Sequence, residues 1–333
     1  MLRGLKKPRS GTIRRPDKFK YRRHKMKIET IKLWDDRDDV ELTTFLTMPD
    51  AFFPDPVPKP AVIVCPGGGY LTCTRHGNEG DPAAMAFAMD GFQTFVLEYS
   101  VQQRAPEGRT LFPAQLIDFG KAILTIREHA DEWLIDVNKI SIIGFSAGAH
   151  LCAMLASTWH EPLLSSYFKV EAELFKPLSV MCIYGIYDYT YQNEAMGYDE
   201  DSPLYMDLNT QVFGTKTPSR AEEEKYSPCC HVTENMPPMF MAAAIDDGLV
   251  PSLQSVRMAE KLHLAGVPYE LHMFQYGDHG FALGRNLAEP FRDEKKHACA
   301  QWLPLAKTFL MHQISPETLE CEKNPFADTA LPI

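Results

Sequence analysis

The stretch from Lys139 to Leu151 reads KISIIGFSAGAHL, and it decides the fold. Its first half, KISIIG, is a β-branched run of the kind that forms a buried strand, and a helix pattern begins directly after the serine. The residues between them, GFSAG, match G-x-S-x-G. That pattern is common by chance, but a strand before it and a helix after it are the setting of a nucleophilic serine on a sharp turn. The sequence therefore predicts that Ser146 is a nucleophile, against the alternative of a structural serine at a glycine-rich helix start.

The residues beside Ser146 are small, as a tight turn from strand to helix requires. Gly144, Ala147 and Gly148 leave room for the chain to reverse direction within a few residues. The helix N-terminus that follows favours the negative charge that develops beside it when a nucleophile attacks a carbonyl. Steric and electrostatic requirements of a nucleophile therefore agree at this turn.

Short apolar runs alternate with longer helical patterns along the rest of the chain. Strands are expected at residues 28–34, 41–48, 61–65, 92–98, 139–144, 178–184, 239–244 and 269–274. Helices are expected at residues 81–90, 113–130, 147–158, 252–265 and 289–311. This alternation predicts an α/β protein with a mostly parallel sheet, helices on both faces and an antiparallel edge made by the first two strands. With the serine turn, it indicates the α/β-hydrolase fold.

A serine hydroxyl needs a base, and the base needs an orienting carboxylate. On this fold the partners follow in the chain order serine, acid, histidine. Asp246 and Asp247 come directly after the expected strand at 239–244. A carboxylate at the carboxyl end of a parallel strand points into the crevice where ligands bind. We predict that Asp247 is the acid; Asp246 stays open, because the sequence does not fix the directions of the two side chains.

The predicted base is His279. It lies in the run GDHGF after the last expected strand, where flanking glycines suit a mobile loop. Three other histidines are weaker candidates. His272 lies within a strand, His150 lies one turn into the helix after the serine, and His76 lies close to a glycine turn.

A developing oxyanion needs backbone N–H donors from two places: the residue after the nucleophile, here Ala147, and the loop after the third strand. That loop reads PGGGY from Pro66 to Tyr70. Three successive glycines let backbone amides approach a substrate oxygen without obstruction by a Cβ atom. The alternative, a phosphate-binding loop, is disfavoured because the run lacks both the P-loop lysine and the G-x-G-x-x-G spacing.

Residues 187–238 form a long, acidic and tyrosine-rich excursion between two expected strands. Segments of this kind are usually lids or substrate-binding insertions, although a surface insertion without a chemical role is the alternative. Tyrosines gather at its start and within it: Tyr184, Tyr187, Tyr189, Tyr191, Tyr198 and Tyr205. Aromatic rings near a crevice can stack on sugars, so we name Tyr187 and Tyr70, the latter at the end of the glycine loop, as candidate substrate-binding residues.

The formal net charge of −10 is unevenly distributed. Residues 1–25 hold eleven Lys or Arg and one acid, so they carry +10 and the rest of the chain carries −20. The strongly acidic remainder of the chain argues against binding to nucleic acid or anionic membranes.

The basic segment at residues 1–25 lacks the apolar run of a secretory signal. We interpret it as a disordered or non-native leader before Met26; an organelle transit peptide and a nucleic-acid-binding arm are the alternatives. The catalytic domain is expected at residues 26–315, followed by a tail at 316–333.

The eight cysteines form no C-x-x-C pair, and several lie in apolar runs where a thiol acts as a small hydrophobe. This usage predicts a reduced, cytoplasmic protein. No apolar stretch approaches the roughly 20 residues that span a bilayer. No cluster of His, Cys, Asp and Glu has metal-ligand spacing. We therefore expect neither a metal nor a cofactor; the oligomeric state, including a homo-oligomer, is left open.

The motifs in their order resemble a known family. CPGGGY, LEYSV, FPAQLIDFGKAI, IDVNKISIIGFSAGAHL, DDGLVP and GDHGF run from about Ala61 to Phe281. Together they resemble the bacterial esterase branch of the α/β-hydrolase superfamily that includes acetylxylan esterase-like and feruloyl esterase-like (BD-FAE-like) enzymes, related to the hormone-sensitive-lipase group. That group has a His before its glycines where this chain has Pro66, which favours the esterase branch. The resemblance implies the triad Ser146, Asp247 and His279, and oxyanion donors near Gly68, Gly69 and Ala147.

The expected activity is hydrolysis of short acyl esters, including acetyl or feruloyl esters of xylan-derived oligosaccharides. The expected partner is a small-molecule or oligosaccharide ester. Two alternatives remain: an amide hydrolase or exopeptidase with the same triad, and a catalytically silent binding protein on the hydrolase fold.

Overall fold

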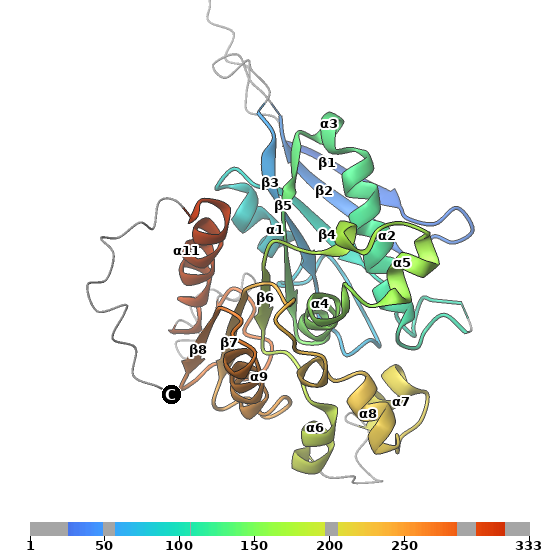
Figure 1. Ribbon diagram of the computed structural model, residues 1–333, viewed down its shortest axis with the longest axis vertical. Helices are drawn as coiled ribbons and strands as arrows, with labels where there is room; N and C mark the ends of the chain where they lie inside the picture. The colour runs from blue at the N-terminus through green and yellow to red at the C-terminus, as the bar shows by residue number, and fades with distance from the viewer. Residues whose placement is uncertain (1–25, 49–56, 107, 197–205, 285–297, 317–333) are drawn as a thin grey trace, which may run out of the picture.

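The computed structural model describes residues 26–48, 57–106, 108–196, 206–284 and 298–316 (Figure 1). The predicted leader, the first part of the last predicted helix, nearly all of the predicted tail, and Tyr198 and Tyr205 lie outside the described residues. The described strands form one eight-stranded sheet in the order β1-β2-β4-β3-β5-β6-β7-β8.

The sheet is mostly parallel, as predicted. Its strands are β1 (Met26–Lys32), β2 (Glu41–Thr47), β3 (Lys59–Cys65), β4 (Gln93–Glu98), β5 (Ile135–Phe145), β6 (Val180–Ile183), β7 (Met239–Ala244) and β8 (Tyr269–Phe274). β2 pairs antiparallel with both β1 and β4, while the strands from β4 through β8 pair in parallel. The predicted antiparallel edge is therefore confirmed.

Helices cover both faces of the sheet (Figure 1). The longer helices are α1 (Asp81–Ala88), α2 (Ala114–Glu128), α4 (Ala147–Thr158), α9 (Leu253–Leu264) and α11 (Trp302–Ile314). The shorter helices outside the insertion are α3 (Ala130–Trp133), α5 (Pro162–Phe168) and the 3₁₀ turn η1 (Ala172–Phe175). α2, α4 and α9 pack in one hydrophobic core, and α1 and α11 pack in a second core on the opposite face.

Adjacent residues of the central strands serve these two cores in turn. Ile63 of β3 and Ile142 of β5 belong to the core under α4, whereas Val64 and Ile143 belong to the core under α1 and α11. Successive side chains of a strand point to opposite faces, so a strand covered on both sides is apolar throughout. The β-branched runs in the sequence are the direct result of this burial.

β5 begins at Ile135, four residues before the predicted start at Lys139. Ile135 is buried and pairs with Lys59 of β3. The partly exposed residues 136–139 between Ile135 and the apolar run hid this start, because strand extension there depends on the neighbouring strand and not on apolar pattern.

The described part of the insertion after β6, which leaves out residues 197–205, holds α6 (Tyr189–Met196), α7 (Met206–Phe213), α8 (Arg220–Lys225) and the 3₁₀ turn η2 (Pro228–Cys230). α6, α7 and α8 lie together at one end of the molecule, beyond α4 (Figure 1). A capping box at Ser219 starts α8, where the Ser219 hydroxyl accepts from the Glu222 amide and the Glu222 carboxylate accepts from the Ser219 amide. The insertion therefore has secondary structure of its own.

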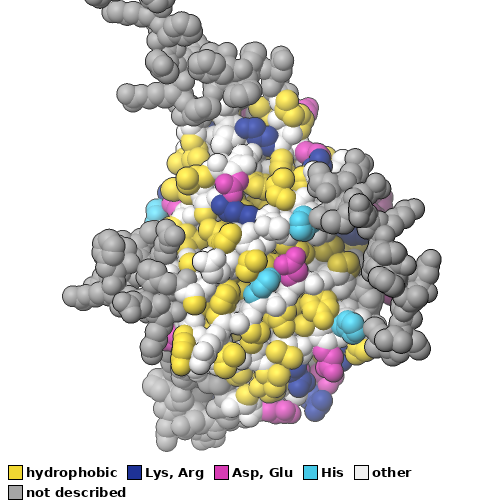
Figure 2. Space-filling view, turned by 90° about the vertical axis from the view of Figure 1, so that its left-hand side faces the viewer, with side chains coloured by type: hydrophobic (Ala, Val, Ile, Leu, Met, Phe, Trp, Pro, Cys, Tyr) yellow, Lys and Arg dark blue, Asp and Glu magenta, His cyan; other side chains and the backbone are white. Residues whose placement is uncertain are grey.

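The face on the α11 side shows hydrophobic side chains interspersed with acidic, basic and histidine side chains (Figure 2). Single exposed apolar residues such as Leu305 and Met311 are normal on a protein surface. In the described ranges, no helix combines the length and the apolar character that crossing a bilayer requires.

Candidate active site

Ser146 occupies the turn between β5 and α4 with a left-handed φ of 50°, a conformation that side-chain-bearing residues rarely adopt. Its amide donates to the Ile183 carbonyl at 3.0 Å, and its carbonyl accepts from the His150 amide at 3.1 Å. A Cβ atom on Gly144 would come within 2.1 Å of the Gly148 carbonyl oxygen. The small residues predicted around the serine are thus required by close backbone approach.

The structure brings Ser146, His279 and Asp247 into one chain of hydrogen bonds. The Ser146 Oγ lies 2.9 Å from the His279 Nε2. The His279 Nδ1 lies 2.9 Å from the Asp247 Oδ2. A carboxylate can only accept here, so the neutral imidazole carries its proton on Nδ1 as the donor to Asp247, and the Nε2 lone pair is left to accept a hydrogen bond from the serine hydroxyl. This is the geometry in which a histidine can act as general base toward a hydroxyl.

Asp247 is held in place from its other side. Its Oδ1 accepts hydrogen bonds from the amides of Leu249 at 2.9 Å and Val250 at 2.8 Å. Its side chain is only 1% exposed, compared with 17% for that of His279. The carboxylate therefore has one fixed orientation, and the imidazole keeps access to the cavity.

Asp246, the alternative acid, lies beside the loop of His279 and does not bond the histidine ring. It is exposed, and its Oδ1 accepts from the amides of Gly277 and Asp278, each at 2.8 Å. These bonds shape the loop that carries His279. Asp246 therefore supports the position of the histidine without contacting its ring.

The three other histidines do not reach Ser146 through their rings. The side chain of His76 is 72% exposed. His272 bonds Glu270 on β8 at 3.1 Å. His150 is fully buried, and its Nδ1 lies 2.6 Å from the Tyr70 hydroxyl while its Nε2 lies 2.8 Å from the Tyr226 carbonyl. Burial lowers the pKa of His150 to about 4, so this histidine is a neutral hydrogen-bonding group.

The glycine loop bends back on itself beside Ser146. Gly68, Gly69 and Tyr70 all have positive φ, at 122°, 61° and 60°. A Cβ atom on Gly68 would lie 2.2 Å from the Thr72 carbonyl oxygen, so only glycine fits there. Within the described residues, neither the Gly68 nor the Gly69 amide donates a hydrogen bond. Both residues line the cavity that also contains Ser146 and Ala147, where their amides are available to a ligand.

The cavity above Ser146 has a volume of about 380 Å³. Its wall is largely apolar and comes from the glycine loop, the insertion and the loop after β7. The lining side chains beyond the triad and the glycine loop include Leu71, Glu79, Ile186, Tyr189, Leu208, Gln211, Leu249 and Val250. A chamber of this size and character is typical of a small-molecule site.

The prediction that Tyr187 binds substrate is wrong. Tyr187 is fully buried and does not line the cavity. The backbone after β6 turns so that Tyr187 points into the core under α4, and Tyr189, two residues on, reaches the cavity wall. Tyr70 does line the cavity, but it is only 2% exposed. The Tyr70 hydroxyl is hydrogen-bonded to His150, so Tyr70 is part of the cavity wall and does not offer its ring for stacking on a sugar.

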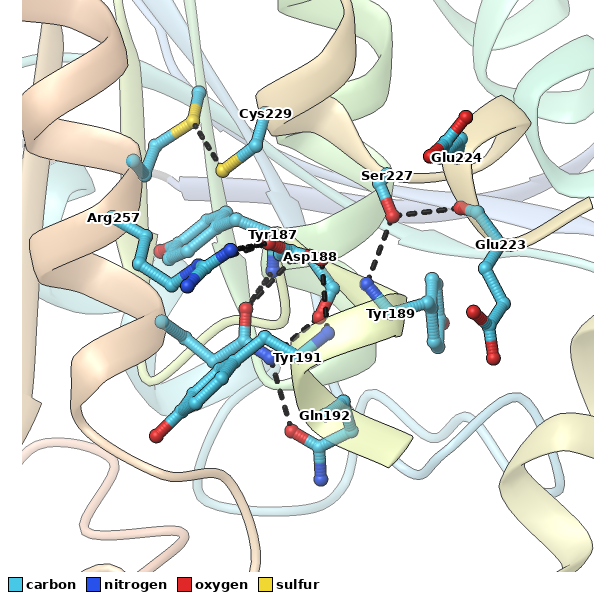
Figure 3. Close-up of polar contacts among 12 residues, drawn as sticks. Tyr187, Asp188, Tyr189, Tyr191, Gln192, Glu223, Glu224, Ser227, Cys229 and Arg257 are labelled. Atoms are coloured by element: carbon cyan, nitrogen blue, oxygen red, sulfur yellow. Dashed lines mark hydrogen bonds and ion pairs between the residues drawn. The ribbon is translucent and has the colours of Figure 1, made fainter. Parts of the chain in front are cut away.

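A buried network fixes the start of the insertion to α9 (Figure 3). The Gln254 Oε1 accepts from the amides of Tyr187 at 2.9 Å and Asp188 at 2.8 Å. Arg257 pairs with the Asp188 carboxylate at 2.7 Å. Farther along, the Tyr189 amide donates to the Ser227 hydroxyl at 2.8 Å. Because α9 follows the loop of Asp247, these bonds connect the cavity wall to the segment that carries the acid.

Sequence reasoning missed Glu79, Leu208 and Gln211 as cavity residues, and it listed Tyr189 among the tyrosines of the insertion without choosing it as a candidate. Glu79 was detectable, since it is an acid shortly after the glycine loop. Nothing in the pattern distinguishes Leu208 and Gln211 from surface or core positions. Within the described ranges, no group of three or more His, Cys, Asp or Glu is arranged to hold a metal ion.

A nucleophile elbow, a glycine loop and an acid and histidine at the ends of consecutive parallel strands define the α/β-hydrolase class. The BD-FAE family profile matches residues 51–262, which is more than half of the chain. The chain therefore belongs to the BD-FAE family.

Two of the proteins with related sequences have names that refer to xylan. Endo-1,4-beta-xylanase B of Butyrivibrio fibrisolvens is 29% identical over 236 residues, which cover 70% of this chain and 34% of that protein. An acetylxylan esterase of Xylanibacter ruminicola is 28% identical over 235 residues, which cover 70% of this chain and 43% of that protein. The match thus spans less than half the length of either relative.

The fold is shared with solved structures. The carboxylesterase Cest-2923 from Lactobacillus plantarum superposes with a TM-score of 0.71 at 23% identity, over 86% of this chain and 98% of that chain. At this identity the likeness concerns the fold.

Proposed function

We propose that this protein is a serine carboxylic-ester hydrolase. The observation that carries the proposal is the hydrogen-bonded chain from Ser146 through His279 to Asp247, with the serine at the floor of an apolar cavity and beside a glycine loop. This arrangement supplies a nucleophile, a base, an orienting acid and free backbone amides in one place, which acyl transfer requires.

In the proposed reaction, His279 removes the proton from the Ser146 hydroxyl as the oxygen attacks the ester carbonyl. The carbonyl oxygen becomes an oxyanion, which the amides of Ala147 and the Gly68–Gly69 loop stabilise. The intermediate collapses as His279 gives its proton to the leaving alcohol, and an acyl-enzyme remains. Water, activated by the same histidine, then attacks the acyl-enzyme and releases the acid. Each oxyanion donor contributes about 10²- to 10³-fold to the rate by analogy with other acyl-transfer sites.

The proposed substrates are short acyl esters, including acetyl or feruloyl esters of xylan-derived oligosaccharides. The cavity is apolar, and its volume of about 380 Å³ is larger than an acetyl group fills. The cavity therefore also has room for a larger acyl group. Two relatives are named for xylan-directed activities, an endo-xylanase and an acetylxylan esterase, which supports a carbohydrate ester.

The proposed setting is the cytoplasm. All seven cysteines in the described ranges are free thiols, and six of them are buried. Free, buried thiols are typical of a reducing compartment. Fractionation of the producing cells, with recovery of the protein outside the cytoplasmic fraction, would contradict this assignment.

The proposal is tested with a fluorophosphonate probe and with p-nitrophenyl acetate, on the natural chain and on Ser146→Ala. We expect the natural chain to be labelled and to release p-nitrophenol, and the variant to do neither. Labelling of the variant would show that another residue is the nucleophile. A parallel assay with aminoacyl p-nitroanilides separates an esterase from an amide hydrolase, since preference for the amides would overturn the ester assignment.

A further inference from the structure

Glu79 stands at the junction of two chambers. One is the apolar cavity of about 380 Å³ above Ser146. The other has a volume of about 310 Å³ and lies behind the glycine loop. Gly68 and Glu79 line both chambers. The ester bond of a substrate at Ser146 would therefore lie next to this carboxylate, with space on either side of it.

The two chambers differ in chemistry. The first is walled by aliphatic and aromatic side chains. The second has a mixed wall, in which the polar residues Thr72, Thr74, Asn78 and Glu79 stand beside Pro66, Ala282 and four glycines. Hydroxyl, amide and carboxylate groups around an open chamber suit a ligand rich in hydroxyl groups, whereas the first chamber suits an apolar group.

The carboxylate of Glu79 is fixed in position by both of its oxygens. Its Oε2 accepts from the Gly67 amide at 2.8 Å, and its Oε1 accepts from the Tyr184 hydroxyl at 2.7 Å. The Tyr184 hydroxyl in turn accepts from the Ala282 amide at 3.0 Å. A carboxylate oxygen has two acceptor sites, so each oxygen of Glu79 can take a further hydrogen bond from a ligand.

The carboxylate also lies close to the nucleophile. A Cβ atom placed on Gly67 would be 2.8 Å from the Glu79 Oε2 and 2.8 Å from the Ser146 Cβ. In the described part of the chain, no Lys, Arg or His forms an ion pair with Glu79. A fixed and uncompensated negative charge therefore faces the place where the substrate must bind.

We propose that Glu79 determines specificity for the alcohol half of the ester: it accepts a hydrogen bond from a hydroxyl of a neutral polyol in the polar chamber, and it excludes alcohols that carry a carboxylate. The proposal rests on the esterase function proposed above. His279 must give its proton to the leaving alcohol, and it lines the apolar cavity together with Ser146 and Glu79. Gly280, the next residue, lines the polar chamber. We therefore place the alcohol half where the two chambers meet at Glu79, with the acyl group in the apolar cavity.

The test compares the natural chain with Glu79→Gln, which keeps the size of the side chain: its Oε1 can accept from the Gly67 amide, and its Nε2 can donate to the Tyr184 oxygen in place of accepting from it. Three acetyl esters serve as probes: a monoacetate of methyl β-xyloside, the methyl ester of O-acetyl-lactate, and O-acetyl-lactate itself. The last two differ in the alcohol half by one methyl group and by the negative charge that it removes, and release of acetate is followed for all three. kcat/KM is measured for each pair, and the probe labelling rate at Ser146 reports an intact site.

We expect Glu79→Gln to lower the ratio of kcat/KM for the xyloside over the neutral lactate ester about tenfold, because a hydrogen bond to a charged acceptor becomes a neutral one. We expect the ratio for O-acetyl-lactate over its methyl ester to rise about tenfold, because a like charge is removed. Glu260→Gln removes a charge from the exposed surface of α9 and should change neither ratio.

Equal losses on all three esters would overturn the proposal, since Glu79 would then only hold the glycine loop. Unchanged ratios would overturn it as well. Failure of the natural chain to cleave any of the esters or to react with the probe would instead contradict the proposed esterase function. The two failures are therefore distinguishable.

Discussion

At the scale of single residues, the turn at Ser146 depends on two glycines, because a Cβ atom would not fit at either position. Gly144 and Gly148 approach neighbouring backbone so closely that no Cβ atom fits. Ser146 itself has a positive φ, which the backbone bonds to Ile183 and His150 support. Strain at a reactive residue persists only where the surrounding structure holds it, and here the small neighbours make that possible.

Replacement of Gly148 by alanine should therefore strongly destabilise the protein. The new Cβ atom would lie 2.0 Å from the Cys65 carbonyl oxygen, so β3 and α4 would have to separate. We expect a loss of about 3 kcal/mol or more in the free energy of unfolding, measured by urea denaturation. Gly248 is the matched control, since a Cβ atom there meets nothing within 4 Å. Gly248→Ala should change the free energy by less than about 0.5 kcal/mol; equal effects of the two variants would contradict the steric argument.

Asp247 and Asp246 are adjacent in sequence but should differ widely in their effect on rate. Asp247→Asn replaces the acceptor of the His279 Nδ1 proton with a group that favours the wrong tautomer, and kcat for p-nitrophenyl acetate should fall about 10³- to 10⁴-fold. Asp246→Asn keeps an oxygen that accepts from the Gly277 and Asp278 amides, so its loss should stay within about tenfold. A larger loss for Asp246→Asn than for Asp247→Asn would reverse the assignment.

At the scale of elements, buried polar contacts determine how the pieces of the site meet. His150 of α4 joins the glycine loop, through the Tyr70 hydroxyl, to the end of α8, through the Tyr226 carbonyl. Gln254 of α9 accepts from the amides of the first residues of the insertion. Arg257 of the same helix pairs with Asp188 (Figure 3). The wall of the cavity is thus tied to α4, the helix that follows Ser146, and to α9, the helix that follows Asp247.

The His150 contact predicts a dependence of stability on pH. Burial lowers the pKa of His150 from 6.5 to about 4, so the unfolded chain binds a proton in this window and the folded chain does not. The free energy of unfolding should therefore fall as the pH falls from about 6.5 to about 4, by about 2 to 3 kcal/mol from this group. In His150→Gln, urea denaturation at pH 7 and pH 4.5 should show a smaller difference between the two pH values. An equal difference in the variant would mean that other groups cause the acid sensitivity.

The Gln254 contact predicts a loss of stability from a helix position with no role in the triad. Gln254→Ala leaves the buried amides of Tyr187 and Asp188 without their acceptor. We expect about 2 to 4 kcal/mol of destabilisation by urea denaturation. Arg257→Ala, which removes a half-exposed partner of the same aspartate, should cost about 1 kcal/mol or less. A cost as large as that of Gln254→Ala would show that the ion pair, and not the amide, anchors the insertion.

β7, α4 and β8 were predicted with their observed bounds. β7 and α4 are buried throughout, whereas all six residues of β8 are half-buried, so a clear local pattern and not complete burial made these elements predictable. The start of β5 and the direction of Tyr187 were not predictable, because each depends on tertiary pairing or on a turn after a strand end. The position of Glu79 in the cavity wall was not predicted for the same reason, since its hydrogen-bond partners Gly67 and Tyr184 are 12 and 105 residues away in the sequence. Local pattern predicts Ser146, Asp247 and His279, whereas the side chains of the cavity wall depend on the fold.

At the scale of the whole molecule, one sheet carries every part of the proposed site. The glycine loop follows β3, Ser146 follows β5, the insertion follows β6, Asp247 follows β7 and His279 follows β8. Parallel strands bring their carboxyl ends to one edge, so residues far apart in sequence meet there. β1 and β2 extend the sheet on the side away from β7 and β8, and the described sheet begins at Met26.

Because the sheet starts at Met26, we expect residues 1–25 to be dispensable for activity and stability. A chain that begins at Met26 should keep kcat/KM for p-nitrophenyl acetate within about twofold and its free energy of unfolding within about 0.5 kcal/mol. The removed residues hold eleven Lys or Arg, so the same pair of proteins also tests whether they bind nucleic acid. We expect neither protein to bind a 20-base-pair DNA at physiological salt, since the body is acidic. Binding by the full chain alone, weakening steeply with salt, would show that the basic residues form a nucleic-acid-binding arm.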